Sequence, residues 1–451
     1  MIALFRDAPA HWRPVRLRRT VLACQNGVWG EEARGGPADV ICVRVADFDR
    51  LGLRLQLHHP TYRFVPDAYL RQRILRPGDL LLEKSGGGEQ QPVGAVVLYE
   101  GEAPAVCSNF IARMPVAAGF DPRYLCYLHA ALYRLGVNRR SIRQTTGIQN
   151  LDSSAYLAEM VRMPDLGEQR QIADFLDRET ALLNRLVENK ERILDRVAEK
   201  RHAAITRTVA GGLDNRATRR FSGVSWLGDV PAHWGVTKLK FVRSGALLYG
   251  ANKAAAGDDR DQPRYIRITD LDDHGALRPD TFQSLPEPLA RPYLLEEGDI
   301  LLARSGATVG KAFRYRREWG RACFAGYLVR LRPDRRKVLP DYLHYYTQSH
   351  AFRHEVRLST VQATIANVSA ERYGRFSIPL PPISEQEAIV GHLDRFTSRI
   401  RALESALERQ VEKLHEYRSS LIVQMVTRGW SATQPPRLPE AAGAPIKAAP
   451  P

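Results

Sequence analysis

The stretch from Glu168 to about Ala210, EQRQIADFLDRETALLNRLVENKERILDRVAEKRHAAITRTVA, decides how the chain is organised. It contains neither Pro nor Gly, and its apolar residues recur at helical spacing between charged ones, which predicts one long amphipathic helix. At 1.5 Å per residue this helix is roughly 65 Å long, too long for the interior of an ordinary domain. We therefore expect a strut. The residues expected to pack against a partner helix are Ile172, Leu176, Leu183, Leu186, Ile193 and Val197.

A second stretch of the same kind runs from Glu385 to about Thr427. Its apolar residues follow one another in steps of three and four over several heptads, a spacing typical of coiled coils. If the first helix leads away from its domain, the second must run back to bury its stripe, so we expect an antiparallel pair with a pseudo-twofold axis. In the alternative, each helix packs only on its own domain. The expected packing residues here are Ile389, Leu393, Phe396, Ile400, Leu403, Leu407 and Leu414.

The two helices belong to a tandem duplication of the whole chain. The residues Glu168-Gln169 and Leu176-Asp177-Arg178 return as Glu385-Gln386 and Leu393-Asp394-Arg395, where 385 − 168 = 394 − 177 = 217. Other repeated pairs stay in the same order: Pro9-Ala10-His11-Trp12 with Pro231-Ala232-His233-Trp234, Gly78-Asp79-Leu80 with Gly298-Asp299-Ile300, and Asn150-Leu151 with Asn367-Val368. Two copies of one domain are therefore predicted.

The predicted fold class is a pair of tandem α/β modules joined by two long antiparallel coiled-coil helices. Strand-like runs such as 79–83 and 299–303 lead into glycine turns, and 122–135 and 340–352 show helical spacing. The segment after 430 is rich in Pro and Ala and is expected to be disordered. The predicted segments are 1–165, the first module; 166–212, the first long helix; 213–382, the second module; 383–430, the second long helix; and 431–451, the tail.

Composition narrows the class of partner and the compartment. The chain has 66 Lys and Arg against 50 Asp and Glu, a formal net charge of +16, which favours an anionic partner such as nucleic acid over a merely soluble surface. Its five cysteines are scattered without a Cys-x-x-Cys pair, so neither a disulfide framework nor a zinc site is expected. No signal-peptide core or membrane-length apolar run occurs, so we expect a cytoplasmic protein without membrane anchorage.

No complete catalytic motif is present. The segment Gly306 to Lys311 resembles a phosphate loop but has three residues between its glycines instead of four, and Ala312 follows the lysine where Ser or Thr is required. Asp165 with Glu188 and Lys190 imitates nuclease spacing, but the last two lie on the long helix. We therefore expect no catalytic, cofactor-binding or metal-binding residue. The alternative, a nuclease or methyltransferase in its own right, needs a motif that is absent.

Basic loops in the two modules carry the candidate DNA-binding residues. Residues 138–146 correspond to 353–362, and Lys84 corresponds to Arg304 before a glycine turn (304 − 84 = 220). Arg and Gln side chains pair bidentately with guanine and adenine edges, while Ser and Thr suit phosphate. Charged loops that contact only solvent are the alternative. The candidates are Lys84, Arg139, Arg140, Arg143, Gln144, Arg304, Lys311, Arg353, Arg357 and Gln362.

With its order of module, long helix, module and long helix, the chain resembles the specificity subunit of type I restriction-modification enzymes. The resemblance rests on the Pro-Ala-His-Trp openings and on Pro379-Leu380-Pro381-Pro382-Ile383-Ser384-Glu385-Gln386-Glu387, and it extends from about Pro9 to Trp430. It implies that each module recognises half of a bipartite double-stranded DNA site and that the helices set the distance between the halves.

The resemblance also implies two methyltransferase subunits and motor-nuclease subunits as partners. S-adenosylmethionine, ATP and Mg would then be cofactors of those partners, and this chain would hold none. A helical scaffold that bridges proteins without binding DNA is the remaining alternative, and a salt-dependent mobility shift with duplex DNA would distinguish it.

Overall fold

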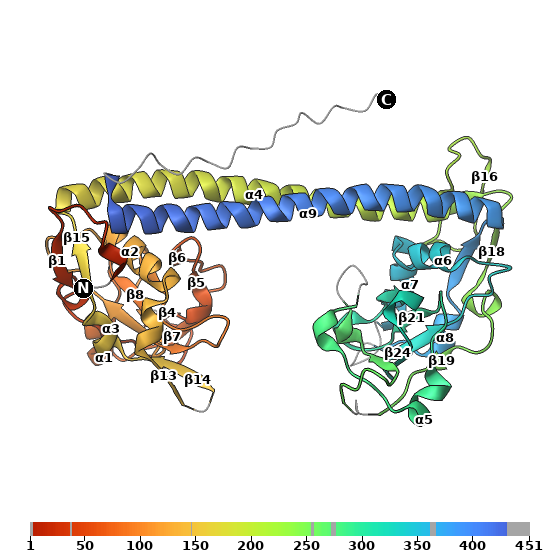
Figure 1. The fold of residues 1–451 in the computed structure, drawn as a ribbon, viewed down its shortest axis with the longest axis horizontal. Coiled ribbons are helices and arrows are strands. Elements are labelled where there is room, and N and C mark those ends of the chain that lie inside the picture. The colour runs from red at the N-terminus through yellow and green to blue at the C-terminus, as the bar shows by residue number, and fades with distance from the viewer. Residues whose placement is uncertain are drawn as a thin grey trace. The chain divides into compact units, whose positions relative to one another are not determined.

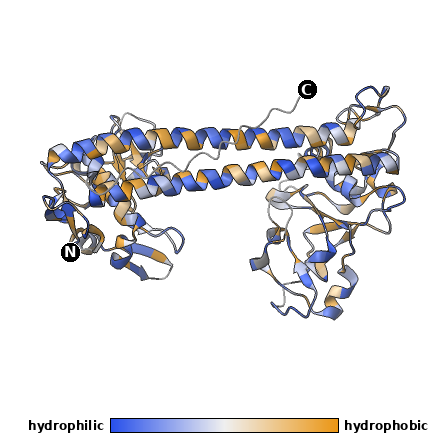
Figure 2. Ribbon diagram, turned by 45° about the horizontal axis from the view of Figure 1, so that its top comes forward, coloured by the Kyte–Doolittle hydropathy of each residue, from blue (hydrophilic) through white to orange (hydrophobic). Residues whose placement is uncertain are grey.

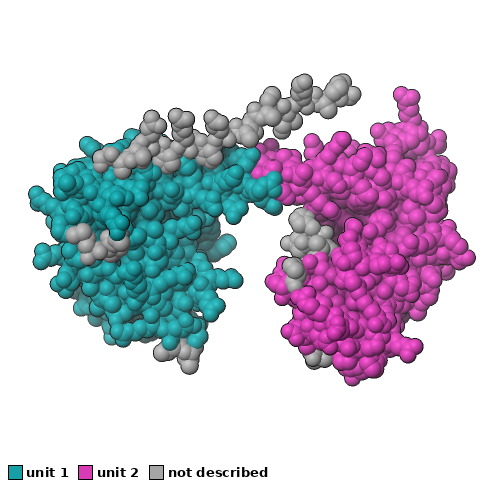
Figure 3. All heavy atoms as spheres, in the orientation of Figure 1, with its two compact units in different colours: residues 1–191, 408–451 teal, residues 192–407 magenta. Residues whose placement is uncertain are grey.

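A computed structural model of the chain describes residues 3–36, 38–145, 147–253, 257–271, 277–360 and 367–430. They form two compact units, coloured separately in Figure 3: unit 1 contains residues 1–191 and 408–451, and unit 2 contains residues 192–407. The two long helices are α4 (Leu166–Gly211) and α9 (Ile383–Arg428), each of 46 residues. Each helix is divided between both units. The predicted tail lies outside the described residues.

The module of unit 1 is organised around β8 (Leu80–Glu83), a strand whose four residues are all buried. Burial on both faces is typical of a central strand, and β8 is paired on both sides in an antiparallel sheet of order β10-β8-β12-β2. A second sheet of order β11-β4-β7-β3 contains a parallel pair, β4 with β11. The other elements are β1 Arg13–Arg16, β2 Gln25–Asn26, β3 Glu31–Glu32, β4 Asp39–Val43, β5 Phe48–Asp49, β6 Arg54–Leu55, β7 Tyr62–Phe64, α1 Asp67–Arg73, β9 Ser85–Gly86, β10 Val96–Leu98, β11 Ala105–Cys107, β12 Ile111–Met114, α2 Pro122–Arg134, β13 Ile142–Thr145, β14 Ile148–Leu151, α3 Ser153–Leu157 and β15 Met160–Met163.

The module of unit 2 repeats this plan. Its central strand β21 (Ile300–Ala303) lies in a sheet of order β19-β24-β21-β22, and β20 pairs with β23 in parallel. In both modules the last strand, β15 or β25, pairs with an early strand, β1 or β18, and leads into a long helix. The duplication is therefore confirmed in three dimensions. The other elements are β16 Arg219–Phe221, β17 Asp229–Pro231, β18 Gly235–Lys238, β19 Leu248–Tyr249, β20 Arg264–Ile266, α5 Glu287–Ala290, β22 Ala312–Arg314, β23 Ala322–Phe324, β24 Leu328–Leu331, α6 Pro340–Thr347, α7 His350–Thr360, α8 Ala370–Gly374 and β25 Ser377–Leu380.

In unit 1 the first half of α4 lies along the last half of α9 (Figure 1). Leu183 and Val187 of α4 form a buried cluster with Leu414 of α9. Closer to the start of α4, Leu176 shares the core of the module with Met425 of α9. Because lower residue numbers on α4 meet higher ones on α9, the two helices run antiparallel within this unit.

The other halves of the two helices pack in the same sense within unit 2. Val209 of α4 shares a core with Ile389 and Leu393 of α9. Nearer the middle of α4, Arg201 Nη1 lies 3.9 Å from Glu404 Oε2. Figure 2 shows apolar and polar residues alternating along both helices, as an amphipathic pair requires. Among the described residues, no helix is long and apolar enough to cross a membrane.

Two of the predicted packing positions are wrong. Ile193 is 45% exposed and Leu403 is 38% exposed. Of their neighbours, Leu194 is partly buried and Glu404 is buried. Steps of three and of four both keep a residue on one helix face, so the spacing allowed either neighbour. In α9, the contact between Glu404 and Arg201 favours the burial of Glu404 over that of Leu403. Of the remaining predicted positions, Ile172, Leu176, Leu183, Val197, Ile389, Leu393, Leu407 and Leu414 are buried, and Leu186, Phe396 and Ile400 are partly buried.

Candidate nucleic-acid interface

Two equivalent cations follow the central strands of the modules. Lys84 comes directly after β8, and Arg304 comes directly after β21. Lys84 Nζ donates to Asn26 Oδ1 at 2.8 Å, while the Arg304 guanidinium carbon lies 4.6 Å from the ring centroid of Tyr249. Asn26 and Tyr249 end the equivalent strands β2 and β19, so each cation is supported from the same strand of its module.

Arg139 and Arg140 lie at the surface on a 3-10 helix, Val137–Ser141. The residue before them, Asn138, is fully buried and donates through Nδ2 to the carbonyl oxygen of Val93 at 2.6 Å. This contact ties the short helix to the core. The two guanidinium groups are thereby presented on an ordered segment.

Arg143 and Gln144 lie on β13, the first strand of a hairpin that Figure 1 shows at the end of the module furthest from α4. Arg143 faces Asn150 across the hairpin. Its guanidinium donates to Asp152 Oδ2 at 2.6 Å, although the arginine side chain is still 78% exposed. The pKa of Asp152 is lowered, first because its carboxylate accepts the N–H of Ala155 and also because of Arg143. A two-stranded ribbon of this kind fits the DNA major groove.

Residues 353–360 of the corresponding segment in unit 2 belong to a helix, so the basic loop predicted there is wrong for these residues. Residues 350–360 form α7, because Phe352 and Val356 recur at helical spacing and are buried in the module. Arg353 Nη2 lies 3.5 Å from His202 Nδ1 on α4, so this arginine is directed toward the long helix. Arg357 is exposed on α7. Lys311 is exposed just before β22, and Gln362 lies outside the described residues.

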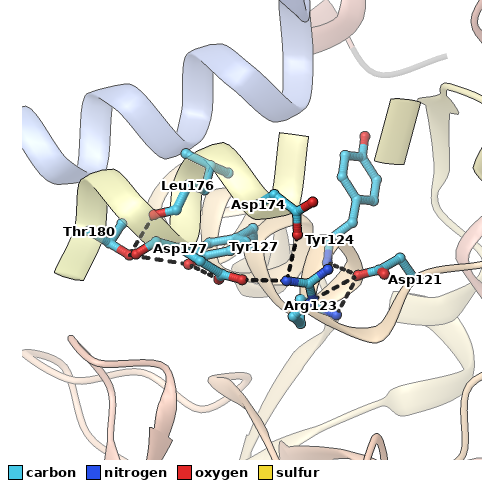
Figure 4. A network of polar contacts seen from close by, with 8 residues as sticks. All are labelled: Asp121, Arg123, Tyr124, Tyr127, Asp174, Leu176, Asp177 and Thr180. Atoms are coloured by element: carbon cyan, nitrogen blue, oxygen red, sulfur yellow. Dashed lines mark hydrogen bonds and ion pairs between the residues drawn. The ribbon is translucent and has the colours of Figure 1, made fainter. Parts of the chain in front are cut away.

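The repeated aspartates of the long helices anchor the modules. In unit 1, Tyr127 of α2 donates to Asp177 Oδ1 at 2.8 Å, and its hydroxyl lies 3.2 Å from Thr180 Oγ1 (Figure 4). Arg123, also on α2, adds ion pairs to Asp177 at 2.7 Å and to Asp174 at 2.8 Å. These contacts fix α2 against the first turns of α4.

Unit 2 contains the same arrangement. Tyr345 of α6 donates to Asp394 Oδ1 at 2.6 Å, and its hydroxyl lies 3.1 Å from Thr397 Oγ1. Burial raises the pKa of Tyr345, so the hydroxyl remains a donor at neutral pH. The repeated Leu-Asp sequence thus has a structural cause: its aspartate receives the module's tyrosine in both units.

The repeated Glu-Gln sequence contacts the module at the start of each long helix. In unit 1, Trp12 Nε1 donates to Glu168 at 3.2 Å, and His11 Nε2 lies 2.8 Å from the same carboxylate. Gln169 is buried; it accepts the N–H of Asp121 at 3.0 Å and donates to the carbonyl of Pro164 at 3.0 Å. In unit 2 the same contacts join Glu385 to His233 and Trp234, and Gln386 to Leu339 and Pro381.

The repeated tryptophans also contact the C-terminal end of the other long helix. A Cβ added at Gly429 would lie 2.9 Å from Cζ2 of Trp12, and one at Gly212 would lie 3.1 Å from Cζ2 of Trp234. Both glycines have a left-handed φ, +62° and +74°, which favours glycine at a helix end. Each tryptophan therefore joins the start of one helix and the end of the other to its module. The sequence showed that these residues are repeated, but it did not show that they hold the long helices on the modules.

The carboxylates considered as nuclease ligands have structural roles or lie apart. Asp165 accepts the N–H of Glu168 at 2.9 Å and so caps α4. The phosphate-loop-like segment forms a 3-10 turn, Gly306–Thr308. In the part of the chain that the structure describes, no group of three or more His, Cys, Asp or Glu residues could hold a metal ion.

Comparison with known proteins gives a consistent result. A family model described as the type I restriction modification DNA specificity domain matches residues 241–413. The StySPI specificity subunit of the type I restriction enzyme from Salmonella potsdam is 23% identical over 394 residues, which cover 82% of this chain and 80% of the relative. The EcoBI specificity subunit from Escherichia coli is 22% identical over 346 residues, 74% of this chain and 72% of the relative.

The fold also matches a solved chain from work on complex assembly and conformational transition of the type I R-M system. The TM-score is 0.67 and the identity 17%, and the match covers 94% of this chain and 99% of that chain. At this identity the likeness shows the fold alone, and it extends over both modules and both long helices.

Proposed function

The chain belongs to the family of type I restriction-modification specificity subunits, and from that premise we propose that each of its modules recognises one half of a bipartite DNA site. One observation carries the proposal: the modules share a frame and the same anchoring to the long helices, but differ in the elements they expose. The short 3-10 helix Val137–Ser141 of unit 1 has the longer helix α7 at the corresponding place in unit 2, where Val356 lies next to Gly310 as Asn138 lies next to Gly94. Different surfaces on one frame suit the recognition of two different sequences.

Two methyltransferase subunits and motor-nuclease subunits are the proposed protein partners. Because the modules are equivalent, a partner that fits one of them finds a second equivalent place on the other, which favours two methyltransferase copies. Native mass spectrometry of the reconstituted complex should give two methyltransferase subunits for each chain. A complex with one copy that methylates both half-sites would contradict this stoichiometry.

S-adenosylmethionine, ATP and Mg are proposed to act in those partners. The purified chain alone, supplied with S-adenosylmethionine or with ATP and Mg, should neither methylate nor cleave duplex DNA, and adding the methyltransferase should restore methylation. Turnover by the highly purified chain would overturn the assignment of chemistry to the partners.

We further propose that the paired helices fix the spacing between the half-sites. Each long helix is one continuous element of 46 residues, and the Lys190 Nζ to Gln410 Oε1 contact of 2.6 Å marks facing positions near the middle. Inserting one heptad at this point in both helices preserves the three-and-four seam and adds about 10 Å. At about 3.4 Å per base pair, the unread spacer should lengthen by about three base pairs. An active variant with an unchanged spacer would contradict the proposal.

Reconstitution tests the function as a whole. The chain with its methyltransferase should bind a duplex specifically and methylate adenines in one bipartite sequence, which methylome sequencing of a host that carries both genes would identify. A chain that binds no duplex at any salt concentration would instead be a protein scaffold.

A further inference from the structure

Both modules carry the same small surface patch at the end of the central strand. We propose that this patch holds the phosphodiester backbone of DNA, independently of base sequence. The inference rests on the proposed function and separates residues that contact the backbone from residues that read bases. The patch contains a cation, the serine that follows it, an asparagine and an exposed aromatic ring. Its members are Lys84, Ser85, Asn150 and Phe110 in unit 1, and Arg304, Ser305, Asn367 and Tyr327 in unit 2.

The backbone of each cation makes the same two hydrogen bonds. The N–H of Lys84 donates to the carbonyl of Phe110 at 2.8 Å, and the carbonyl of Lys84 accepts the N–H of Leu151 at 2.7 Å. In unit 2 the N–H of Arg304 donates to the carbonyl of Tyr327 at 3.0 Å, and its carbonyl accepts the N–H of Val368 at 2.8 Å. The aromatic ring and the asparagine are therefore placed on either side of the cation in both modules.

The rings and the asparagines of the patch are exposed, the cations and serines are partly buried, and side chains of the patch are hydrogen-bonded to one another. Phe110 is 43% exposed and Tyr327 is 69% exposed, so neither ring is packed fully into the core. Ser85 Oγ donates to Asn150 Oδ1 at 2.6 Å, and Arg304 Nε donates to Asn367 Oδ1 at 3.4 Å. Each asparagine accepts a hydrogen bond through Oδ1 in these contacts, so its amide N–H groups point away from them as donors.

Neither cation is bound to a carboxylate within the described residues, where Lys84 contacts an amide oxygen and Arg304 an amide and a ring. Other arginines are held in ion pairs, as Arg143 is by Asp152 at 2.6 Å and Arg332 by Asp299 at 2.8 Å. A cation without such a partner, next to the amide donors of an asparagine, suits a phosphate oxygen. The exposed ring beside it supplies an apolar face for the adjoining sugar.

The repetition decides between backbone and bases. If the modules recognise different sequences, residues that read bases should differ between them, as the 3-10 helix Val137–Ser141 of unit 1 and α7 of unit 2 do. Phosphates and sugars are the same in every half-site. A patch that is kept in both modules therefore fits the part of DNA that both half-sites share.

The test uses the full chain assembled with its methyltransferase subunits and two fluorescent duplexes, one cognate and one scrambled. Lys84→Gln and Arg304→Gln remove the charge but keep a polar side chain. Each variant should weaken binding to both duplexes by the same factor and lower the slope of log affinity against log salt by about 0.9, with about twice that change for the double variant. Tyr327→Ser should weaken both duplexes equally without changing the slope. The methylated sequence should stay the same in every case.

Matched controls separate the patch from general charge. Lys84→Arg and Arg304→Lys should retain the wild-type slope, and Arg196→Gln, an exposed position on α4, should leave both affinities unchanged. A glutamine variant that weakens only the cognate duplex, or that changes the methylated sequence, would make the patch a reader of bases and overturn the proposal. Unchanged slopes in folded variants would also overturn it. If the wild type binds no duplex, the proposed function itself fails; if it binds specifically and the variants do not differ, only the patch assignment fails.

Discussion

The hydroxyl of Tyr345 offers a direct test of how a module is held on its long helix. It donates to Asp394 Oδ1 at 2.6 Å and lies 3.1 Å from Thr397 Oγ1, while the tyrosine itself is only 7% exposed. Tyr345→Phe deletes both contacts and leaves the ring in place. The variant therefore reports on the hydrogen bonds and not on packing.

A hydrogen bond to an ionised group contributes about 1.5 to 3 kcal/mol. Asp394 is exposed and regains water when the tyrosine hydroxyl is removed, so the lower end of this range applies. We expect Tyr345→Phe to lower the free energy of unfolding of unit 2 by about 1.5 kcal/mol. For a unit of this size the melting temperature should fall by about 3 to 6 °C.

Hydrogen–deuterium exchange measured by mass spectrometry can locate the effect. Peptides from α6 and from the first turns of α9 should exchange faster in Tyr345→Phe, whereas peptides from the module of unit 1 should not change. The matched variant Tyr127→Phe should produce the reverse pattern, since its hydroxyl contacts Asp177 in unit 1.

A double-mutant cycle supplies the decisive comparison. Because Tyr345 and Asp394 form one interaction, Tyr345→Phe with Asp394→Asn should destabilise unit 2 by clearly less than the sum of the two single changes, with a coupling of about 0.5 kcal/mol or more. Strictly additive losses, or equal acceleration of exchange in both units, would refute the anchoring role.

Three further predictions concern the helices, the buried histidine and the hairpin. Leu194→Ala should lower the free energy of unfolding by about 1 to 2 kcal/mol in thermal unfolding, whereas Ile193→Ala should change it by less than about 0.5 kcal/mol. Equal losses in the two variants would mean that Ile193 packs between the helices, as the sequence predicted. Burial lowers the pKa of His129 to about 4, below the unfolded value of about 6.5, so stability held above pH 6.5 should be lost as the pH falls toward 4, by up to about 3 kcal/mol. Melting curves of His129→Gln should show a weaker pH dependence over that window, and an unchanged dependence would exclude His129 as its source. Arg143→Ala should cost about 1 to 3 kcal/mol on the cognate duplex and relax specificity at one base pair, measured by methylome sequencing; equal weakening on all duplexes would make it a phosphate contact.

The architecture was predictable because it depends on long-range repetition and on helix periodicity. The bounds of α4 and α9 fall within two residues of the predicted segments 166–212 and 383–430. The strands β8 and β21 begin one residue after the predicted starts at 79 and 299. Such elements are strongly specified by local sequence, since an amphipathic helix and a buried strand each have their own spacing.

Tertiary contacts decided the features that spacing left open. Leu194 and Ile193 both satisfy a three-or-four step, and only the facing helix determines which one turns inward. The segment around Arg353 has basic residues like the loop in the first module. It forms helix α7, because Phe352 and Val356 lie on one face and are buried in the module. The roles of Trp12 and Trp234 depend on residues more than 150 positions away in sequence, so no local pattern could have revealed them.

Exchange of one module tests the central claim most directly. In a host that carries the methyltransferase gene, residues 1–165 should be replaced by the first module of a related specificity subunit, with the anchoring residues Trp12 and Tyr127 retained at their equivalent positions. Methylome sequencing should then show that one half of the bipartite sequence changes, while the other half and the spacer between them remain as in the wild type. A change in both halves, or in neither, would contradict recognition by two independent modules.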